Sequence, residues 1–337
     1  MDCLDICDLA DGAARLSGAP NQPALVVVDL SRAHWSGPAP AAAAAELGER
    51  SVVTVGWSST PLPPVSRRLL EALTVTIAPG GPGITWVDSA DAVEDVAATV
   101  AAAPGAALTL AALLPATARA DVYDGLQLES LAYSTLLAGP EFAAWRARTP
   151  IRPIPECNEP VLLDRSGDVL TLTLNRPERH NAFGRTVRDG LIDALEVARL
   201  DPTIESVLVR GAGRSFCSGG DLDEFGTAAD PVAAHAVRLA RSAGWAVHRL
   251  RERVTTQVHG ACIGAGIEIP AFAGRIEATS DAWFQLPELG MGLVPGAGGT
   301  VSITRRIGHW RTAYLALTGA RLDAPTALAW GLIDAVA

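Results

Sequence analysis

A run of prolines near the middle of the chain most constrains how the chain can fold. The twelve residues TPIRPIPECNEP (149–160) contain four prolines. Because proline lacks a backbone N–H and clashes with the preceding helical turn, no helix can continue through this segment. We therefore predict a domain boundary here, which divides the chain into residues 1–150 and 151–337.

The first half shows short strand-like runs followed by helix-like segments. Runs rich in β-branched residues and bounded by Pro, Gly or Ser predict buried strands at 24–30, 51–57 and 73–78. Apolar residues spaced three and four apart, with Asp or Ser at their starts, predict helices at 91–103 and 121–137. These patterns indicate an α/β domain over residues 1–150.

In the second half, a strand, a glycine-rich turn and a helix follow one another repeatedly. Alternating apolar residues on both sides of Ser166-Gly167-Asp168 predict a hairpin over 161–175. The same patterns predict a helix at 184–200, a strand at 206–211, one long helix at 231–251 and a strand at 254–260. This order is typical of an α/β fold whose functional loops follow the strand ends.

The composition excludes several classes of protein. The 337 residues include 27 Lys and Arg against 37 Asp and Glu, and the net charge of −10 disfavours a nucleic-acid partner. The five irregularly spaced cysteines form no disulfide framework or metal-ligand pattern, so we expect no metal and a reducing, cytoplasmic location. The first residues, MDCLDICDLADG, do not resemble a signal peptide, and no uncharged apolar run is long enough to cross a membrane, so we expect no membrane association.

Three glycine-rich segments carry the candidate chemistry: GAGRSFCSGGD (211–221), HGACIGAGIEIPAF (259–272) and FQLPELGMGLVPGAGGT (284–300). Pro270 requires a helix that begins close to Ala265, and the free N–H groups of such a helix start suit a developing oxyanion. Glu268 and Glu288 are isolated carboxylates among apolar residues, as paired acid and base groups are. Taken singly, each segment could equally be a turn, a helix start or a loop.

Five motifs occur together in the second half: NRPERHNAF, FCSGGDLDEF, VHGACIGAGIEI, FQLPELGMGLVPGAGGT with RRIG after it, and LTGARLDAPTALAWGLID. Their order and spacing over about residues 160–337 resemble the crotonase, or enoyl-CoA hydratase/isomerase, superfamily. The resemblance implies an α/β fold, a ClpP-like spiral of ββα units, which assembles as a homotrimer or a dimer of trimers. It also implies an acyl-CoA thioester substrate, with no bound cofactor beyond the coenzyme A of the substrate and no metal.

The resemblance also assigns roles to individual residues. It places the two oxyanion N–H groups at Gly220 and Ala265, the group that activates water at Glu268, and the group that protonates the α-carbon at Glu288. It implies that CoA and substrate are contacted by Arg179, His180, Asn181, Ala182, Ser218, Gly219, Asp221, Gly264 and Gly266. Two retained glutamates favour an enoyl-CoA hydratase. The alternatives are isomerase, dehydratase or hydrolase chemistry on the same scaffold, or a noncatalytic acyl-CoA-binding subunit.

The chain departs from the family pattern at its end. Members of the superfamily continue past the GLID-type strand with helices that cover the acyl pocket, whereas this sequence stops at Ala337. Residues 98–149 are similar to that helical tail. We therefore expect residues 20–150 to be a degenerate crotonase-like domain whose helices supply the lid of the catalytic core at 151–337. The alternative is an unrelated α/β domain attached to that core.

Overall fold

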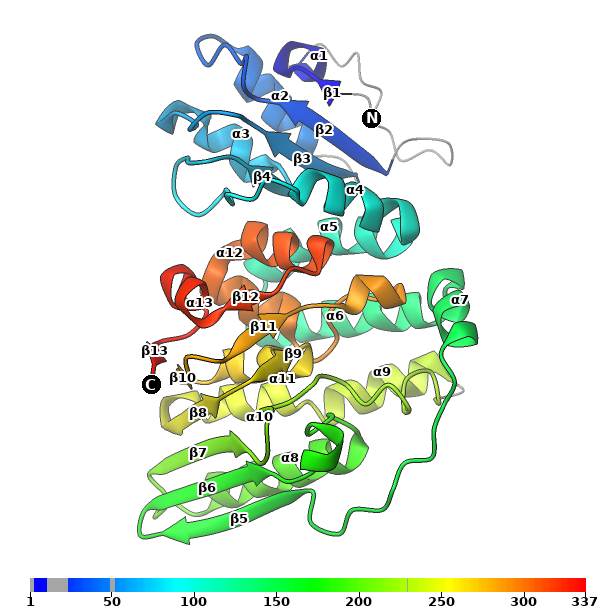
Figure 1. Cartoon of the computed structure of the whole chain (residues 1–337), viewed down its shortest axis with the longest axis vertical. Coiled ribbons are helices and arrows are strands. Elements are labelled where there is room, and N and C mark those ends of the chain that lie inside the picture. The colour runs from blue at the N-terminus through cyan, green and yellow to red at the C-terminus, as the bar shows by residue number, and fades with distance from the viewer. Residues whose placement is uncertain (1–2, 11–23, 49–51, 229) are drawn as a thin grey trace.

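The computed structural model describes residues 3–10, 24–48, 52–228 and 230–337. A small sheet built by the start of the chain lies at one end of the molecule, and the sheets of the second half lie at the other end (Figure 1). A layer of helices separates them. The predicted α/β class is therefore confirmed.

The sheet of the first half is parallel, with its strands in sequence order: β1 (Cys3–Leu4), β2 (Leu25–Asp29), β3 (Val53–Trp57) and β4 (Val75–Ile77). The three predicted strands are confirmed, although position 51 lies outside the described residues. Val26 and Val28 of β2 pack against helices α1 (Ile6–Ala10), α2 (Ala39–Gly48) and α3 (Arg67–Ala72), with η1 (Pro64–Ser66) before α3. Val27 faces the opposite side, as the two-residue period of a strand requires.

Four helices follow this sheet: α4 (Ala92–Ala102), α5 (Pro104–Arg119), α6 (Val122–Leu137) and α7 (Pro140–Arg148). Both predicted helices are confirmed, and the Asp121 side chain caps α6 by accepting a hydrogen bond from the N–H of Asp124 at 2.9 Å. Among the described residues, no single helix is long and apolar enough to cross a membrane. Within the described ranges, one bent pair of helices, α4 and α5 with an angle of 115° between them, has the length and composition that a membrane-crossing segment needs.

The second half contains a six-stranded and a three-stranded sheet. The larger has the order β13 (Ala335–Val336), β10 (Arg275–Ala278), β8 (Val254–Val258), β7 (Ser206–Gly211), β6 (Val169–Leu174) and β5 (Val161–Ser166). The smaller has the order β12 (Leu322–Asp323), β11 (Trp283–Gln285) and β9 (Ala261–Ile263). The predicted hairpin is β5–β6, and Gly167 in its turn has a φ of +63°.

The helices of the second half connect these strands. They are α8 (Arg185–Leu200), α9 (Pro231–Ala240), α10 (Ala243–Arg249), α11 (Ala265–Glu268), α12 (Gly299–Thr318, broken at Gly308) and α13 (Ala324–Trp330). Single 3₁₀ turns are η2 (Pro177–Arg179), η3 (Arg251–Arg253), η4 (Pro270–Phe272) and η5 (Glu288–Met291). Strands followed by a helix thus recur along the second half, as the predicted spiral of ββα units requires.

The prediction of one long helix over 231–251 is wrong. The chain leaves the helical conformation at Arg241, and the Ser242 side chain accepts a hydrogen bond from the N–H of Trp245 at 3.2 Å. Ser242 is therefore the N-cap of a second helix, α10, because a serine side chain can satisfy one of the free N–H groups of a helix start.

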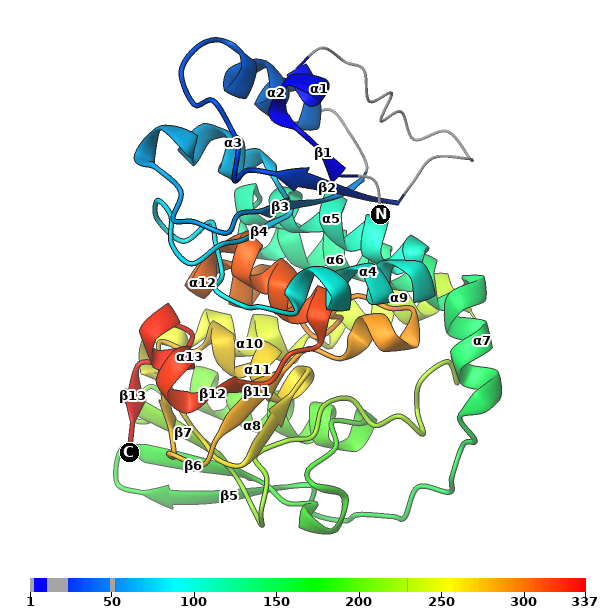
Figure 2. The ribbon, with the colours of Figure 1, turned by 45° about the horizontal axis from the view of Figure 1, so that its top comes forward.

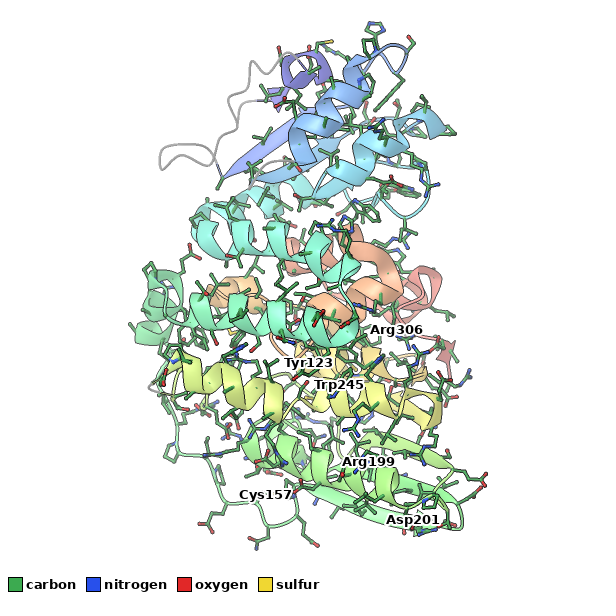
Figure 3. The ribbon with its side chains drawn as sticks, turned by 180° about the vertical axis from the view of Figure 1, so that it is seen from behind. Tyr123, Cys157, Arg199, Asp201, Trp245 and Arg306 are labelled. Atoms are coloured by element: carbon green, nitrogen blue, oxygen red, sulfur yellow. The ribbon has the colours of Figure 1, made fainter. Side chains whose placement is uncertain are left out.

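The helical layer joins the two halves. Helices α4, α5 and α6 pack against α12, and one hydrophobic core extends from Val53 and Val75 of the first sheet to Ile333 near the end of the chain (Figure 2). Seen from behind, Tyr123 at the start of α6 lies against Trp245 of α10, with ring centroids 5.2 Å apart (Figure 3). The division at residue 150 stays a prediction, and this shared core crosses it.

Candidate functional site

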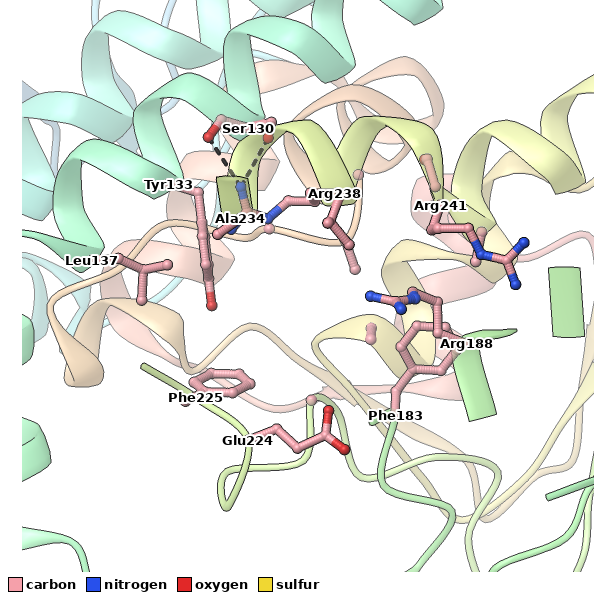
Figure 4. Close-up of a pocket in the computed structure, with 18 of the residues that line it drawn as sticks. Ser130, Tyr133, Leu137, Phe183, Arg188, Glu224, Phe225, Ala234, Arg238 and Arg241 are labelled. Carbon is pink, nitrogen blue, oxygen red and sulfur yellow. Dashed lines mark hydrogen bonds between the residues drawn. The ribbon is translucent and has the colours of Figure 1, made fainter. Parts of the chain in front are cut away.

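A cavity of about 520 Å³ lies between helices α6 and α9 and the loops that follow β7, β9 and β11. Tyr133 of α6 extends into it toward Phe225, while Arg188 and Arg241 lie near Phe183 on the other side (Figure 4). Five of the residues that the sequence singles out line the cavity: Gly220, Asp221, Ala265, Glu268 and Glu288. Residues far apart in the sequence thus form one site.

The carboxyl groups of Glu268 and Glu288 meet at Gly264. The point that a Cβ on Gly264 would occupy lies 2.5 Å from Oε1 of Glu288 and 3.6 Å from Oε1 of Glu268. Gly264 also has φ +49° and ψ −120°, a conformation that residues with a side chain rarely adopt. Glycine is therefore required here both for its backbone conformation and for the close approach of the two carboxyl groups.

Glu268 is held by the loop that leads into α12. Its Oε2 accepts hydrogen bonds from the N–H groups of Ala297 at 2.8 Å and Gly299 at 2.9 Å. Burial raises the pKa of Glu268 to about 7, and the two N–H donors limit the rise because they stabilise the charged form. A carboxyl group with such a pKa can both accept and release a proton near neutral pH.

Glu288 lies at the start of η5 and has a different environment. Its side chain is buried, and Oε2 has no hydrogen-bond partner among the described residues. Burial, together with the charge of Glu268, raises the pKa of Glu288 well above its ordinary value. Two adjacent carboxyl groups with different environments are therefore suited to opposite roles, with Glu288 the more easily protonated.

The backbone N–H groups of Gly220 and Ala265 lie at the cavity and have no backbone partner in the described part of the chain. Ala265 is the first residue of α11, where helix geometry leaves the N–H free. Gly220 lies beside Phe183, whose N–H donates to the carbonyl of Gly219 at 2.7 Å and whose carbonyl accepts from Asp221 at 3.3 Å. The RPERHNAF loop thus fixes the segment that presents the Gly220 N–H.

An ion-pair network fixes the same two loops to each other. Asp221 is 1% exposed and accepts a hydrogen bond from Arg179 at 2.7 Å, while buried Arg176 lies 3.5 Å away. Arg179 also contacts Asp223 at 2.6 Å, and the N–H of Arg152 from the proline-rich segment donates to Asp223 at 2.9 Å. These contacts lower the pKa of Asp223 to about 2. Arg176, Asp223 and Arg152 were not among the residues predicted from the sequence.

The remaining residues that were predicted to contact CoA or substrate lie in the loops around the site and do not line the cavity. Asn181 is buried, and its Nδ2 donates to the carbonyls of Ala212, Ser215 and Phe216 at 2.8, 2.9 and 3.1 Å. Its side chain is thus occupied within the protein. The others are exposed His180, buried Ala182, Gly219, Gly264 and Gly266, and partly exposed Arg179 and Ser218.

Helix α6 contributes a residue that sequence reasoning missed. Glu129 is 2% exposed, lines the cavity, and accepts hydrogen bonds from Gly298 and Thr300. The sequence feature that could have pointed to Glu129 is its position as a single acidic residue within the apolar stretch LQLESLAYSTLL. Its contacts depend on how α6 packs against α12, which the sequence pattern does not reveal.

The two cysteine thiols near the cavity, those of Cys217 and Cys262, are poor nucleophiles. Burial raises the pKa of the Cys217 thiol to about 12 and that of Cys262 well above its ordinary value. Neither thiol is therefore a ready nucleophile. In the part of the chain that the structure describes, no three His, Cys, Asp or Glu side chains form a group that could hold a metal ion.

Comparison with known proteins identifies relatives of the second half. The family model described as Enoyl-CoA hydratase/isomerase matches residues 164–337. A trans-2-decenoyl-[acyl-carrier-protein] isomerase of Streptococcus mutans is 33% identical over 51% of this chain and 67% of its own. A 2,3-dehydroadipyl-CoA hydratase of Escherichia coli is 32% identical over 52% of this chain and 68% of its own.

A solved structure of the same family is also similar to this chain. The crystal structure of an enoyl-CoA hydratase/isomerase from Mycobacterium paratuberculosis has a TM-score of 0.50 and 29% identity, over 54% of this chain and 74% of that chain. The chain spans about two thirds of the length of these curated relatives. The similarity therefore covers the second half and leaves most of the first half unmatched.

Proposed function

Because the chain belongs to the enoyl-CoA hydratase/isomerase family, we propose that it adds water across the double bond of a trans-2-enoyl-CoA. The observation that carries this proposal is the meeting of Glu268 and Glu288 at Gly264, in the cavity where the N–H groups of Gly220 and Ala265 lie without a backbone partner among the described residues. The crotonase fold expected for the second half is confirmed. That the first half is a degenerate copy remains a prediction.

In the proposed reaction, the thioester carbonyl oxygen accepts hydrogen bonds from the N–H groups of Gly220 and Ala265. Attack of water at the β-carbon pushes the electron pair of the double bond toward that oxygen. Backbone donors already fixed at the site stabilise the resulting enolate because they need no reorientation as charge develops. The RPERHNAF loop supports this role because it fixes the Gly220 segment through Phe183.

The two glutamates then divide the proton transfers. Ionised Glu268 takes a proton from the attacking water as the new carbon–oxygen bond forms at the β-carbon. Protonated Glu288 gives its proton to the α-carbon as the enolate collapses, so the substrate gains one water overall. Proton exchange through solvent then restores both groups. The assignment is supported by the two N–H donors that stabilise the charged form of Glu268, and by Oε2 of Glu288, which has no hydrogen-bond partner among the described residues.

Coenzyme A enters this proposal only as part of the substrate. Hydration changes no net oxidation state, so the reaction requires no electron carrier. Both carboxyl groups and both N–H groups come from the chain itself.

We further propose that helices α6 and α7 form the lid over the acyl part of the cavity. Leu126, Tyr133 and Leu137 of α6 and Phe142 of α7 line it, and they all belong to the first half. Deletion of residues 1–150 tests this idea. We expect a remainder with little or no turnover, and a soluble, fully active remainder would refute the lid.

Isomerisation is the second candidate, because the Streptococcus mutans relative is named as an isomerase. Moving a double bond requires one carboxyl group that removes and returns a proton, whereas hydration uses both. A 3-enoyl-CoA that is converted by the wild type and by Glu288→Gln would favour this candidate.

The direct test follows the absorbance of the conjugated enoyl thioester in a panel of short and long trans-2-enoyl-CoAs. We expect the wild type to turn over at least one of them, and Glu268→Gln and Glu288→Gln each to abolish turnover. Binding without turnover across the panel would instead favour a noncatalytic acyl-CoA-binding subunit. We also propose assembly as a homotrimer or a dimer of trimers, which light scattering of the purified protein measures.

A further inference from the structure

A third buried carboxyl group lies beside the two glutamates of the proposed reaction. Glu129 is on α6, in the first half of the chain, and is 2% exposed. Its Oε1 accepts a hydrogen bond from the N–H of Gly298 at 2.7 Å. Its Oε2 accepts from the N–H of Thr300 at 2.9 Å and from the Thr300 hydroxyl at 2.7 Å. The whole carboxyl group is thus bound to one short loop of the second half.

The N–H groups of four consecutive residues, 297–300, alternate between two carboxyl groups. Those of Ala297 and Gly299 donate to Glu268, and those of Gly298 and Thr300 donate to Glu129. The donors of residues 298–300 belong to the N-cap and first turn of α12, where the helix dipole also favours negative charge, and Ala297 comes directly before them. Each peptide unit is planar and shares a Cα atom with the next, so the carboxyl group that holds one pair of N–H groups also restricts the positions of the other pair.

We propose that Glu129 is a positioning residue, which fixes the loop at 297–300 so that its other two N–H groups orient the Glu268 carboxyl for catalysis. This inference rests on the proposed function. It also gives the first half a role beyond covering the cavity, because Glu129 of α6 binds two N–H groups of the loop that holds Glu268.

The groups that face Glu129 come from four elements. They are Glu268 of α11, Glu288 of η5, Arg238 of α9 and Tyr133 of α6 itself. Burial and the charge of Glu268 raise the pKa of Glu129 to about 8. Removing a negative charge at Glu129 would by itself lower the pKa of Glu268, whereas weaker N–H donation from the loop would raise it. The direction in which the Glu268 midpoint moves therefore distinguishes an effect of charge from an effect of the loop.

The test is Glu129→Gln in the full chain. Glutamine keeps the size of the side chain, but its amide nitrogen would face the N–H of Thr300, donor against donor, so the loop must shift. We expect kcat to fall roughly 10- to 100-fold, as small displacements of catalytic groups cause, with KM changed by less than about threefold. Because weaker N–H donation disfavours ionised Glu268, its titration midpoint should rise by roughly half to one pH unit.

Two measurements report these effects. The first is kcat and KM against pH, with an enoyl-CoA that the wild type turns over. The second is the infrared band of protonated carboxyl groups, titrated in the protein without substrate, with Glu268→Gln identifying the band that belongs to Glu268. The second measurement needs no turnover. It therefore decides this inference even where the proposed function fails.

Asp323→Asn is the matched control. Asp323 also accepts a backbone hydrogen bond at a helix start, from the N–H of Thr326 at 2.8 Å in α13, and it does not line the cavity. We expect Asp323→Asn to keep the wild-type kcat and the wild-type titration midpoint of Glu268. Should Glu129→Gln not fold, Thr300→Val keeps both carboxyl groups and removes one donor, with smaller changes in the same direction.

Two results would overturn the inference. One is a Glu129→Gln protein, or its Thr300→Val substitute, with wild-type kcat and an unchanged Glu268 midpoint. The other is a midpoint that moves to lower pH, because that direction means that Glu129 acts through its charge and not by holding the loop.

Discussion

Substitution of Gly264 by alanine should have two separate effects, a loss of activity because the two carboxyl groups are displaced and a loss of stability because the backbone is strained. The new Cβ would lie 2.5 Å from Oε1 of Glu288, whereas ordinary van der Waals contact begins near 3.4 Å, so the carboxyl group must move by about 1 Å. Such a displacement costs roughly 100-fold in rate. The backbone conformation, with φ +49°, adds about 2 kcal/mol of strain to the folded state.

Two further glycines provide the controls for Gly264→Ala. Gly319 also has a positive φ, of +62°, but its ψ of +21° places it in the left-handed helical region, and a Cβ there would meet nothing within 4 Å. Gly319→Ala should therefore lose about 1 kcal/mol of stability and keep kcat. Gly290 has neither constraint, so Gly290→Ala should change little. Thermal unfolding and the enoyl-thioester absorbance assay measure both effects. A Gly264→Ala protein that loses stability but retains the wild-type kcat would refute the claim that the two carboxyl groups must meet here.

Three further predictions concern charge and reactivity. Because Glu268 must be ionised and its pKa is about 7 in the protein without substrate, kcat/KM should rise with pH through about 7 and be roughly 100-fold lower at pH 5. It should fall again where Glu288 loses its proton, and a flat profile would contradict these roles. Asp221→Asn should destabilise the fold by about 3 kcal/mol in denaturant unfolding, because it leaves the buried charge of Arg176 without its carboxylate, and an unchanged midpoint would refute this. A thiol reagent at pH 8 should leave Cys217 unmodified in the folded protein, since its thiol pKa is raised to about 12, and mass spectrometry detects the contrary result.

Local patterns were sufficient to predict the elements on which the site is built. The turn at Gly167 and the alternating residues on either side predicted the β5–β6 hairpin, because both signals are contained within one short segment. Likewise, Pro270 and the glycines before it placed the helix start at Ala265. The proposed roles of Gly220, Glu268 and Glu288 were instead implied by the resemblance of the five motifs to the superfamily, and no single local pattern assigned them.

Contacts between distant segments could not be predicted in this way. Glu129 contacts Thr300 because α6 packs against α12, and no short pattern encodes that packing. Arg152 lies in a proline-rich segment that looks like a linker, yet its N–H binds Asp223 in the loop after β7. The break at Ser242 was missed for a different reason, since the apolar periodicity continues across the cap.

The start of α12 explains how three carboxyl groups can share one buried region. A buried carboxylate is costly unless donors replace the water that it loses. Here the free N–H groups of residues 297–300 supply those donors to Glu129 and Glu268, while Glu288 has an oxygen without a partner among the described residues. The donors of the loop therefore favour the ionised form of Glu268, whereas Glu288 gains no such support for its charge at Oε2 and is suited to stay protonated. Glu268 is thus suited to act as the base because its carboxyl group reaches the start of α12, and Glu288 is suited to act as the acid because its carboxyl group does not. A change that loosens the loop at 297–300 should therefore disturb Glu268 more than Glu288.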